Sequence, residues 1–317
     1  MRGRMNGRLV SALAMAILVL LPARGVAQLL DPLAEPITPV PAAVHEDPSR
    51  AALGRALFTD PRLSANGAIS CASCHDLRSN GASAAVHDPA PDGRHTALNT
   101  PTVFNATLDF RLQWHGDART LAEQAGIALT DPDIMASTPG KVLIAIDREP
   151  GMDGRFWAAY GHKPTWPSLL DAIATFERTL TTPDSRFDLW LRGDHAALSA
   201  DELDGYRLFK SVGCVSCHQG VGVGGNLFEK VGVADQSLYI AGSVFRVPSL
   251  RNVAVTAPYF HDGSALTLTD AVHKMGAGQL GLNLSDREVG QIVSFLQTLT
   301  GRYNGNLVSA APGPAAR

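Results

Sequence analysis

All four cysteines of the chain lie in two Cys-x-x-Cys-His boxes, at residues 71–75 and 214–218. This pentapeptide is the attachment signature of a c-type haem: the two thiols add to the haem vinyl groups and the histidine ligates the iron. A redox-active Cys-x-x-Cys pair or half of a zinc site would not explain a histidine after both pairs. The sequence therefore predicts two covalently bound haems. The expected attachment and ligand residues are Cys71, Cys74 and His75 for the first haem, and Cys214, Cys217 and His218 for the second.

The first 27 residues have the features of an export signal. Three arginines precede an apolar run at residues 9–21 that is too short to cross a membrane comfortably, and residues 25–27 are small, as at a cleavage site. Covalent haem attachment in bacteria takes place outside the cytoplasm, so the signal and the haem boxes support each other. We therefore expect a cleavable signal peptide at residues 1–27 and a periplasmic protein, with an uncleaved membrane anchor as the alternative.

Removing residues 1–27 from the 317-residue chain leaves 290 residues, which is enough for two domains of ordinary size. The 27 basic residues do not exceed the 30 acidic ones, which argues against a nucleic-acid partner. Disulfides are not expected, because the haem boxes use every cysteine. We expect an N-terminal haem domain at residues 28–190, a C-terminal haem domain at residues 191–303 and a flexible tail at residues 304–317.

A helical pattern precedes each haem box. Asp47 and Pro48 form an N-cap followed by a first-turn proline, and apolar residues at helical spacing follow them. Capping boxes occur at residues 199–202 and 285–288, and further helical patterns at residues 121–129 and 168–180. The order of a short amphipathic helix, a haem box and a return loop occurs twice. This repeat predicts a mainly α-helical protein of two cytochrome c-like domains, each with one covalently bound c-type haem.

Several segments outside the haem boxes match one known family. They are residues 57–64, 99–105, 176–180, 185–188, 245–252 and 257–263. Through these segments and the two boxes, the chain resembles the bacterial di-haem cytochrome c peroxidase family from about residue 53 to residue 301. This family also includes the di-haem maturation enzyme of methylamine dehydrogenase.

The resemblance implies different tasks for the two haems, with peroxide chemistry at the N-terminal haem and electron entry at the C-terminal haem. A thioether ligand favours reduced iron and raises the potential, and the resemblance implies Met275 as the axial ligand of the second haem. A buried helix methionine is the alternative. His273, two residues earlier, is left without a role. For the first haem, His87 matches the family's displaceable distal histidine, with His95 in the same loop, or an open position, as the alternatives.

The resemblance also implies residues between the haems. Trp114 matches a tryptophan that lies between the two haems in the family, and Gln124 matches a glutamine of the distal pocket. A calcium ion between the domains is implied as well, held by the side chain of Asn99 and the backbone carbonyls of Thr256 and Pro258. Hard oxygen donors of this kind suit calcium, although Asn99 could instead cap a turn.

Two positions depart from the family pattern. The family has a distal glutamate ten residues after the glutamine matched by Gln124, and this chain has Ile134 there. An isoleucine cannot accept a proton, so the usual acid/base group for cleaving peroxide is missing. Asp133 is a candidate replacement and Asp131 another, although each is also a common turn residue. The family's Trp-Asp-Gly-Arg reads Trp-His-Gly-Asp at residues 114–117, which adds a histidine to the distal candidates.

Three functions are compatible with these residues. The leading one is a periplasmic peroxidase that reduces hydrogen peroxide to water with electrons from a small cytochrome c or a cupredoxin. The second is an oxidase that uses peroxide to modify side chains of a partner protein, as the maturation enzyme does. That enzyme has a tyrosine on its second haem, so Met275 favours the peroxidase, whereas Ile134 favours the oxidase. The third is a non-enzymatic di-haem electron carrier. Family members are commonly homodimers, so the resemblance also implies a homodimer.

Overall fold

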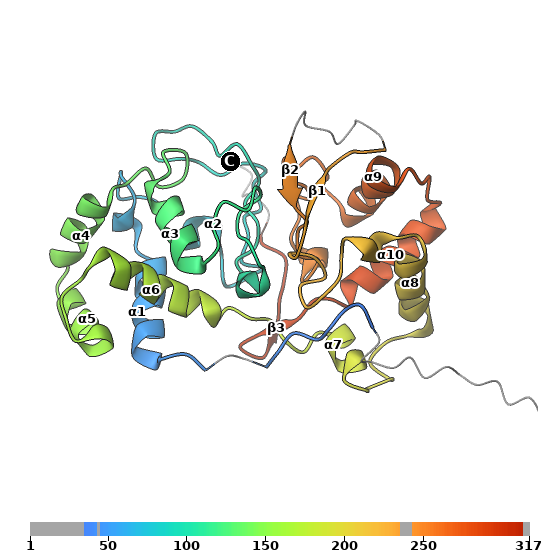
Figure 1. The fold of residues 1–317 in the computed structure, drawn as a ribbon, viewed down its shortest axis with the longest axis horizontal. Coiled ribbons are helices and arrows are strands. Elements are labelled where there is room, and N and C mark those ends of the chain that lie inside the picture. The colour runs from blue at the N-terminus through green and yellow to red at the C-terminus, as the bar shows by residue number, and fades with distance from the viewer. Residues whose placement is uncertain (1–34, 43–44, 235–242, 313–317) are drawn as a thin grey trace, which may run out of the picture.

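The computed structural model describes residues 35–42, 45–234 and 243–312, so the expected signal peptide lies outside the described residues (Figure 1). The described part is mostly helical, which confirms the expected mainly α-helical fold. None of its helices is both long and apolar enough to cross a membrane. The helices are α1 (Pro48–Phe58), α2 (Cys71–Cys74), α3 (Leu121–Thr130), α4 (Pro139–Asp147), α5 (Met152–Tyr160), α6 (Trp166–Arg178), α7 (Arg186–Leu191), α8 (Ala200–Ser211), α9 (Leu268–Leu280) and α10 (Asp286–Gln297).

The remaining elements of the described residues are short. Two strands of the second half pair antiparallel, with Glu229 opposite Phe245, and a second antiparallel pair follows α10. The strands are β1 (Phe228–Lys230), β2 (Val244–Arg246), β3 (Arg302–Tyr303) and β4 (Asn306–Leu307). The 3₁₀ turns are η2 (Pro61–Leu63), η3 (Ala106–Leu108), η4 (Cys214–Ser216) and η6 (Val253–Val255).

The first half is built on the crossing of α1 with α6. The Asp47 side chain caps α1 by accepting a hydrogen bond from the Arg50 backbone N–H, as the sequence predicts. Gly54 lies where the two helices touch, and a Cβ on this residue would lie 1.9 Å from the Ala172 carbonyl oxygen. A side chain at this point would push the helices apart, so glycine is required for the close contact.

The second half repeats this construction with α8 and α10. Both helices begin with the capping boxes expected from the sequence, at Ser199 and Ser285. Gly205 lies at their contact, and a Cβ there would lie 2.0 Å from the Gln291 carbonyl oxygen. In each half, the helix before the haem box therefore packs closely against a helix after the box, α1 against α6 and α8 against α10. This contact fixes the position of the box relative to the core.

The two ends of the described chain are exchanged between the halves. Ile37, before α1, is fully buried in the core around α8 and α10, and Val308, after β4, is buried in the core formed by Phe58, Phe104 and Phe176. Figure 1 shows the blue N-terminal segment reaching across to the second half and the red β3 lying between the halves. The start of the tail expected to be flexible is thus ordered through residue 308, because Val308 fills an apolar gap in the first half.

Buried polar side chains connect the halves where the chain passes between them. The Asn105 side chain donates to the Thr182 hydroxyl over 2.7 Å and accepts from the Thr182 backbone N–H over 2.8 Å. Asn252, from the second half, donates to the same hydroxyl over 3.0 Å and accepts from the Gly301 backbone N–H over 2.9 Å. Because these bonds are buried, they fix the relative position of the two halves.

Candidate haem sites

The first haem box opens with α2, and the histidine that follows is oriented by the backbone. His75 Nδ1 lies 3.0 Å from the Gly81 carbonyl oxygen. A carbonyl oxygen can only accept, so Nδ1 carries the proton and Nε2 is left with a free lone pair for a metal. Burial lowers the pKa of His75 and favours the neutral imidazole, which is the form that ligates iron.

The second box repeats this arrangement. His218 Nδ1 lies 3.2 Å from the Val223 carbonyl oxygen, and burial lowers the pKa of this histidine to about 4. The loop can fold this closely because residue 224 is a glycine with φ of +132°, where a Cβ would lie 2.2 Å from the Pro248 carbonyl oxygen. Both histidines therefore present Nε2 as a neutral ligand.

Each box lies in the wall of a cavity. The first cavity is lined by the first box and by residues of α3, and the second by the second box and by residues of α9. Burial raises the pKa of Cys71 and of Cys74 to about 12, so neither thiol ionises readily at neutral pH. A redox dithiol needs a thiolate, and this disfavours that alternative. Within the described residues, no group of three His, Cys, Asp or Glu side chains that could hold a metal ion is found. Paired thiols and a neutral imidazole at an apolar cavity fit haem c.

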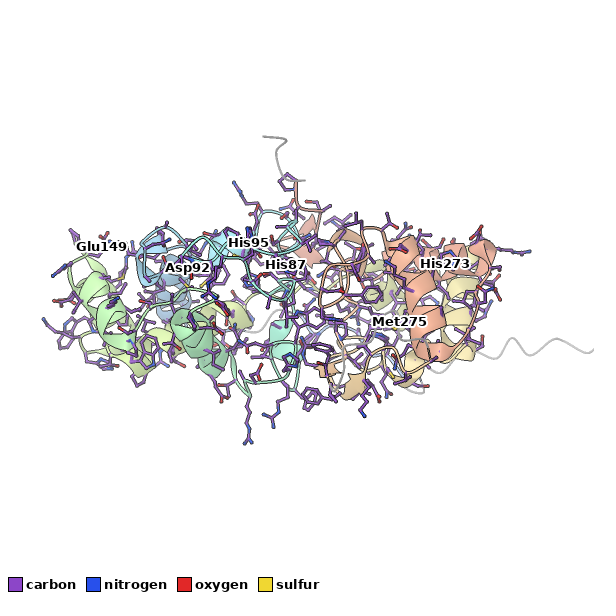
Figure 2. All side chains as sticks on the ribbon, turned by 90° about the horizontal axis from the view of Figure 1, so that it is seen from above. His87, Asp92, His95, Glu149, His273 and Met275 are labelled. Atoms are coloured by element: carbon purple, nitrogen blue, oxygen red, sulfur yellow. The ribbon has the colours of Figure 1, made fainter. Side chains whose placement is uncertain are left out.

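The predicted axial methionine lies in the wall of the second cavity. Met275 projects from α9 into the same cavity that His218 lines. His273 is different: its side chain is 37% exposed and its Nε2 lies 3.3 Å from Asp286 Oδ1, at the surface. Figure 2 labels both residues in the second half. The structure thus brings together the two side chains expected to ligate the second haem, and Met275 as a ligand stays a prediction.

Of the three candidate distal histidines of the first haem, His115 lines the first cavity, whereas the loop histidines His87 and His95 do not. His87 Nδ1 is buried without a hydrogen-bond partner, and His95 is exposed with Nδ1 3.2 Å from the His87 carbonyl oxygen. Both lie on the loop between the first box and residue 99, and neither is among the described residues of the cavity wall (Figure 2). To ligate the first haem, His87 would have to move with its loop.

Trp114 lies at the wall shared by the two cavities. It lines both of them, and its indole Nε1 donates a hydrogen bond to the Asn99 carbonyl oxygen over 2.8 Å. Its ring packs edge-on against Phe245 and His261, with centroids 6.2 Å and 6.3 Å away. The indole is therefore fixed at the wall shared by the two cavities, and its role between the haems stays a prediction.

The wall of the first cavity also contains the other expected distal residues. Gln124 from α3 lines the cavity, and so do Asp131, Asp133 and Ile134 from the turn after that helix. The Asp133 Oδ1 atom lies 2.7 Å from Arg94 Nη2 in an exposed ion pair. Ile134 thus lines the cavity with an apolar side chain, and the Asp133 carboxylate is paired with an arginine.

The Asn99 side chain is oriented suitably for binding calcium. Asn99 Nδ2 donates to the Ala85 and Val86 carbonyl oxygens over 3.1 Å and 3.2 Å, which points its Oδ1 away from them as a free acceptor. Asn99, Thr256 and Pro258 line the same cavity. An amide oxygen and backbone carbonyls are ligands that calcium prefers. The calcium site stays a prediction, supported by this arrangement.

The cavity walls also contain buried charged residues that were not expected as site residues. Glu177 lines the first cavity, and Asp109 and Arg246 line both cavities. A signal for Glu177 exists in the sequence, since it lies four residues after Ile173 on the apolar face of α6. Asp109 and Arg246 lie in loop and strand segments without such a pattern, and they meet only when the two halves pack together.

A protein with two such boxes, each in the wall of an apolar cavity, is a di-haem c-type cytochrome as a class. A family model described as di-haem cytochrome c peroxidase matches residues 48–196, and a cytochrome c model matches residues 203–300. The cytochrome c551 peroxidase of Nitrosomonas europaea is 43% identical over 282 residues, which cover 84% of each chain. The chain belongs to the di-haem cytochrome c peroxidase family.

The chain is also similar to one further relative in sequence and to one solved structure. The methylamine utilization protein MauG of Methylorubrum extorquens is 34% identical, with 82% of this chain and 81% of that protein covered. A crystal structure of a MauG-like protein associated with microbial copper homeostasis has a TM-score of 0.74 and 27% identity, and covers 83% of this chain and 93% of that one. The resemblance drawn from the sequence is thereby confirmed. The domain boundary at residues 190–191 stays a prediction.

Proposed function

We propose that this protein reduces hydrogen peroxide to water, with electrons from a small cytochrome c or a cupredoxin. The observation that carries the proposal is Trp114, which lines both cavities, each with a histidine whose Nε2 is free. When bound, the two haems supply the iron centres that bind peroxide and transfer electrons. The protein residues then have to hold, tune and connect these two centres.

The second half is suited to receiving electrons. His218 and Met275 line one cavity, and a thioether paired with an imidazole stabilises reduced iron. Trp114 provides an aromatic ring between this cavity and the first one. We infer that electrons enter at the second cavity and pass the Trp114 indole on their way to the first.

The first half is suited to binding peroxide, but its proton transfer differs from the family pattern. The Gln124 amide lies in the cavity wall, where it can hydrogen-bond to a bound oxygen ligand. Ile134 has no atom that accepts a proton. The Asp133 carboxylate, which also lines the cavity, is the candidate for this role, and its Oδ1 is paired with Arg94 Nη2 over 2.7 Å.

The test is peroxide-dependent oxidation of a reduced small c-type cytochrome by the holoprotein, with and without prior half-reduction. Turnover by the wild type is expected, and Ile134→Glu should increase it because a carboxyl group returns to the cavity wall. Ile134→Gln is the matched control, since it is polar and of similar size but cannot exchange a proton in the same way. Absence of turnover in both the wild type and Ile134→Glu would contradict the proposal.

A second function has one observation in its favour. Ile134 in the cavity wall leaves the peroxide site without the usual proton-transfer residue, and a protein-modifying oxidase needs a long-lived oxidised state rather than rapid turnover. For that function, stoichiometric peroxide should change the haem spectra without oxidising the small cytochrome. If the spectrum is unchanged and there is no turnover, a non-enzymatic electron carrier is the remaining function.

We also propose the setting in which the protein works. Residues 1–27 would direct export to the periplasm, where the haems are attached, and calcium would bind between the halves at Asn99, Thr256 and Pro258. Support for the calcium comes from the free Oδ1 of Asn99. A homodimer is the expected assembly.

A further inference from the structure

A buried ion pair joins the two halves at the wall shared by both haem cavities. Asp109 follows η3 in the first half, and Arg246 ends β2 in the second half. Arg246 Nη1 lies 2.7 Å from Asp109 Oδ2, and each side chain is only 7% exposed. Both residues line both cavities, so any charge that arrives in either cavity acts on this pair.

The backbone around the pair holds it in a fixed position. The Arg246 backbone N–H donates to the Trp114 carbonyl oxygen over 2.8 Å, and its Nε donates to the Gln113 carbonyl oxygen over 3.3 Å. On the other side, Asp109 packs against Gly225, where a Cβ would lie 1.9 Å from Asp109 Oδ1. The carboxyl group therefore lies between Arg246 of the strand and a glycine loop, and Arg246 is hydrogen-bonded to the backbone of Trp114, the residue proposed to connect the haems.

The pair is incompletely satisfied. Asp109 Oδ1 and Arg246 Nη1 are both buried without a hydrogen-bond partner, so the 2.7 Å contact to Oδ2 is an ion pair without good hydrogen-bond geometry. A buried charge that lacks hydrogen bonds is costly. A proton on the carboxylate removes that charge, which makes this group easier to protonate than an exposed aspartate.

Burial, and not the neighbouring charge, brings the protonation of Asp109 near neutral pH. Burial raises the pKa of Asp109 to about 7, and the Arg246 guanidinium opposes this rise. The glycine loop contributes no charge at the contact, since it presents Gly222 and Gly225. On the segment that carries Asp109, the Arg111 side chain packs against Gly116. An electron added to either cavity brings negative charge closer and raises the pKa of the carboxyl group further.

We propose that Asp109 takes up a proton when the haem pair gains an electron, with Arg246 as the positioning residue that holds the carboxylate at the shared wall. One electron enters from the donor, and one proton from water binds the Asp109 carboxylate to give the neutral acid. When the electron leaves, the proton returns to water. This inference rests on the two haems of the proposed function and not on peroxide turnover.

The experiment is potentiometric titration of the holoprotein, followed by the haem absorption spectra, at a series of pH values on both sides of neutrality. In the wild type, at least one haem potential should fall as the pH rises through neutral pH. In Asp109→Asn this slope should decrease, because the amide cannot take up the proton. Asp60→Asn is the matched control: Asp60 is also a buried carboxyl paired with an arginine, but it does not line either cavity, so the wild-type slope should remain.

Two results would overturn the proposal. One is a pH slope in Asp109→Asn equal to that of the wild type. The other result comes from the wild type and does not depend on whether a variant folds. The reduced-minus-oxidised infrared spectrum of the wild type should contain the carbonyl stretch of a newly protonated carboxylic acid. The absence of this stretch would rule out proton uptake by Asp109. Where Asp109→Asn folds, that signal should be lost from its spectrum.

Discussion

Glu177 should make the stability of this protein depend strongly on pH. It lies near the end of α6, its residue is only 6% exposed, and its Oε2 has no hydrogen-bond partner. Burial raises the pKa of Glu177 from 4.5 to about 8, although the Arg178 guanidinium lowers it. Because the folded state binds this proton more tightly than the unfolded chain, the stabilisation is complete below about pH 4.5 and is lost as the pH rises through about 8. The total is about 5 kcal/mol.

Glu177→Gln should remove this dependence, because glutamine resembles the protonated acid and cannot ionise. The free energy of unfolding of the variant minus that of the wild type should increase by about 1.4 kcal/mol for each pH unit across this window, and level off on both sides. Urea unfolding of the holoprotein at several pH values measures this difference. Glu229→Gln, at an exposed position of β1, is the control for the same chemical change. A Glu177→Gln difference that stays constant with pH would refute the reasoning.

Two further substitutions test the haem sites and the core. Met275→Leu should lower the potential of the second haem sharply in a redox titration, since the thioether favours reduced iron, and an unchanged potential would exclude Met275 as the ligand. Gly205→Ala should lower the free energy of unfolding by about 1–3 kcal/mol or more, because its Cβ would lie 2.0 Å from the Gln291 carbonyl oxygen. Gly290→Ala in α10 has open space around the added Cβ and should instead be neutral or stabilising by about 0.5–1 kcal/mol. Equal thermal stability of the two alanine variants would contradict the proposed helix contact.

Local signals in the sequence predict many of the helices that position the haem boxes. Asp47 before α1 and the capping boxes of α8 and α10 have side chains that bond to the adjacent backbone, so their effect is readable from a few neighbouring residues. The helices α4 and α5 were not predicted from the sequence, although Thr138 and Pro139 form the same kind of N-cap and first-turn proline. Neither haem box lies next to them in the sequence, so the repeated order of helix, box and return loop does not include them.

The sequence likewise predicts one part of the candidate site and not the other. The cysteines and histidines of the boxes are contiguous, so their chemistry is encoded locally, and the matched positions Met275 and Gln124 do lie in the cavity walls. The pairing of Asp109 with Arg246 could not be predicted, because it forms only when the two halves meet. The position of His87 outside the first cavity could not be predicted either, since it depends on how a long polar loop folds.

The exchange of chain ends has a consequence for the order in which the protein can be completed. Synthesis proceeds from the N-terminus, so Ile37 is already available when α8 and α10 emerge, and the second half can close its core without waiting. The first half needs Val308, one of the last described residues to be made. The half that comes first in the chain is therefore finished last, because its core is incomplete until residue 308 is in place.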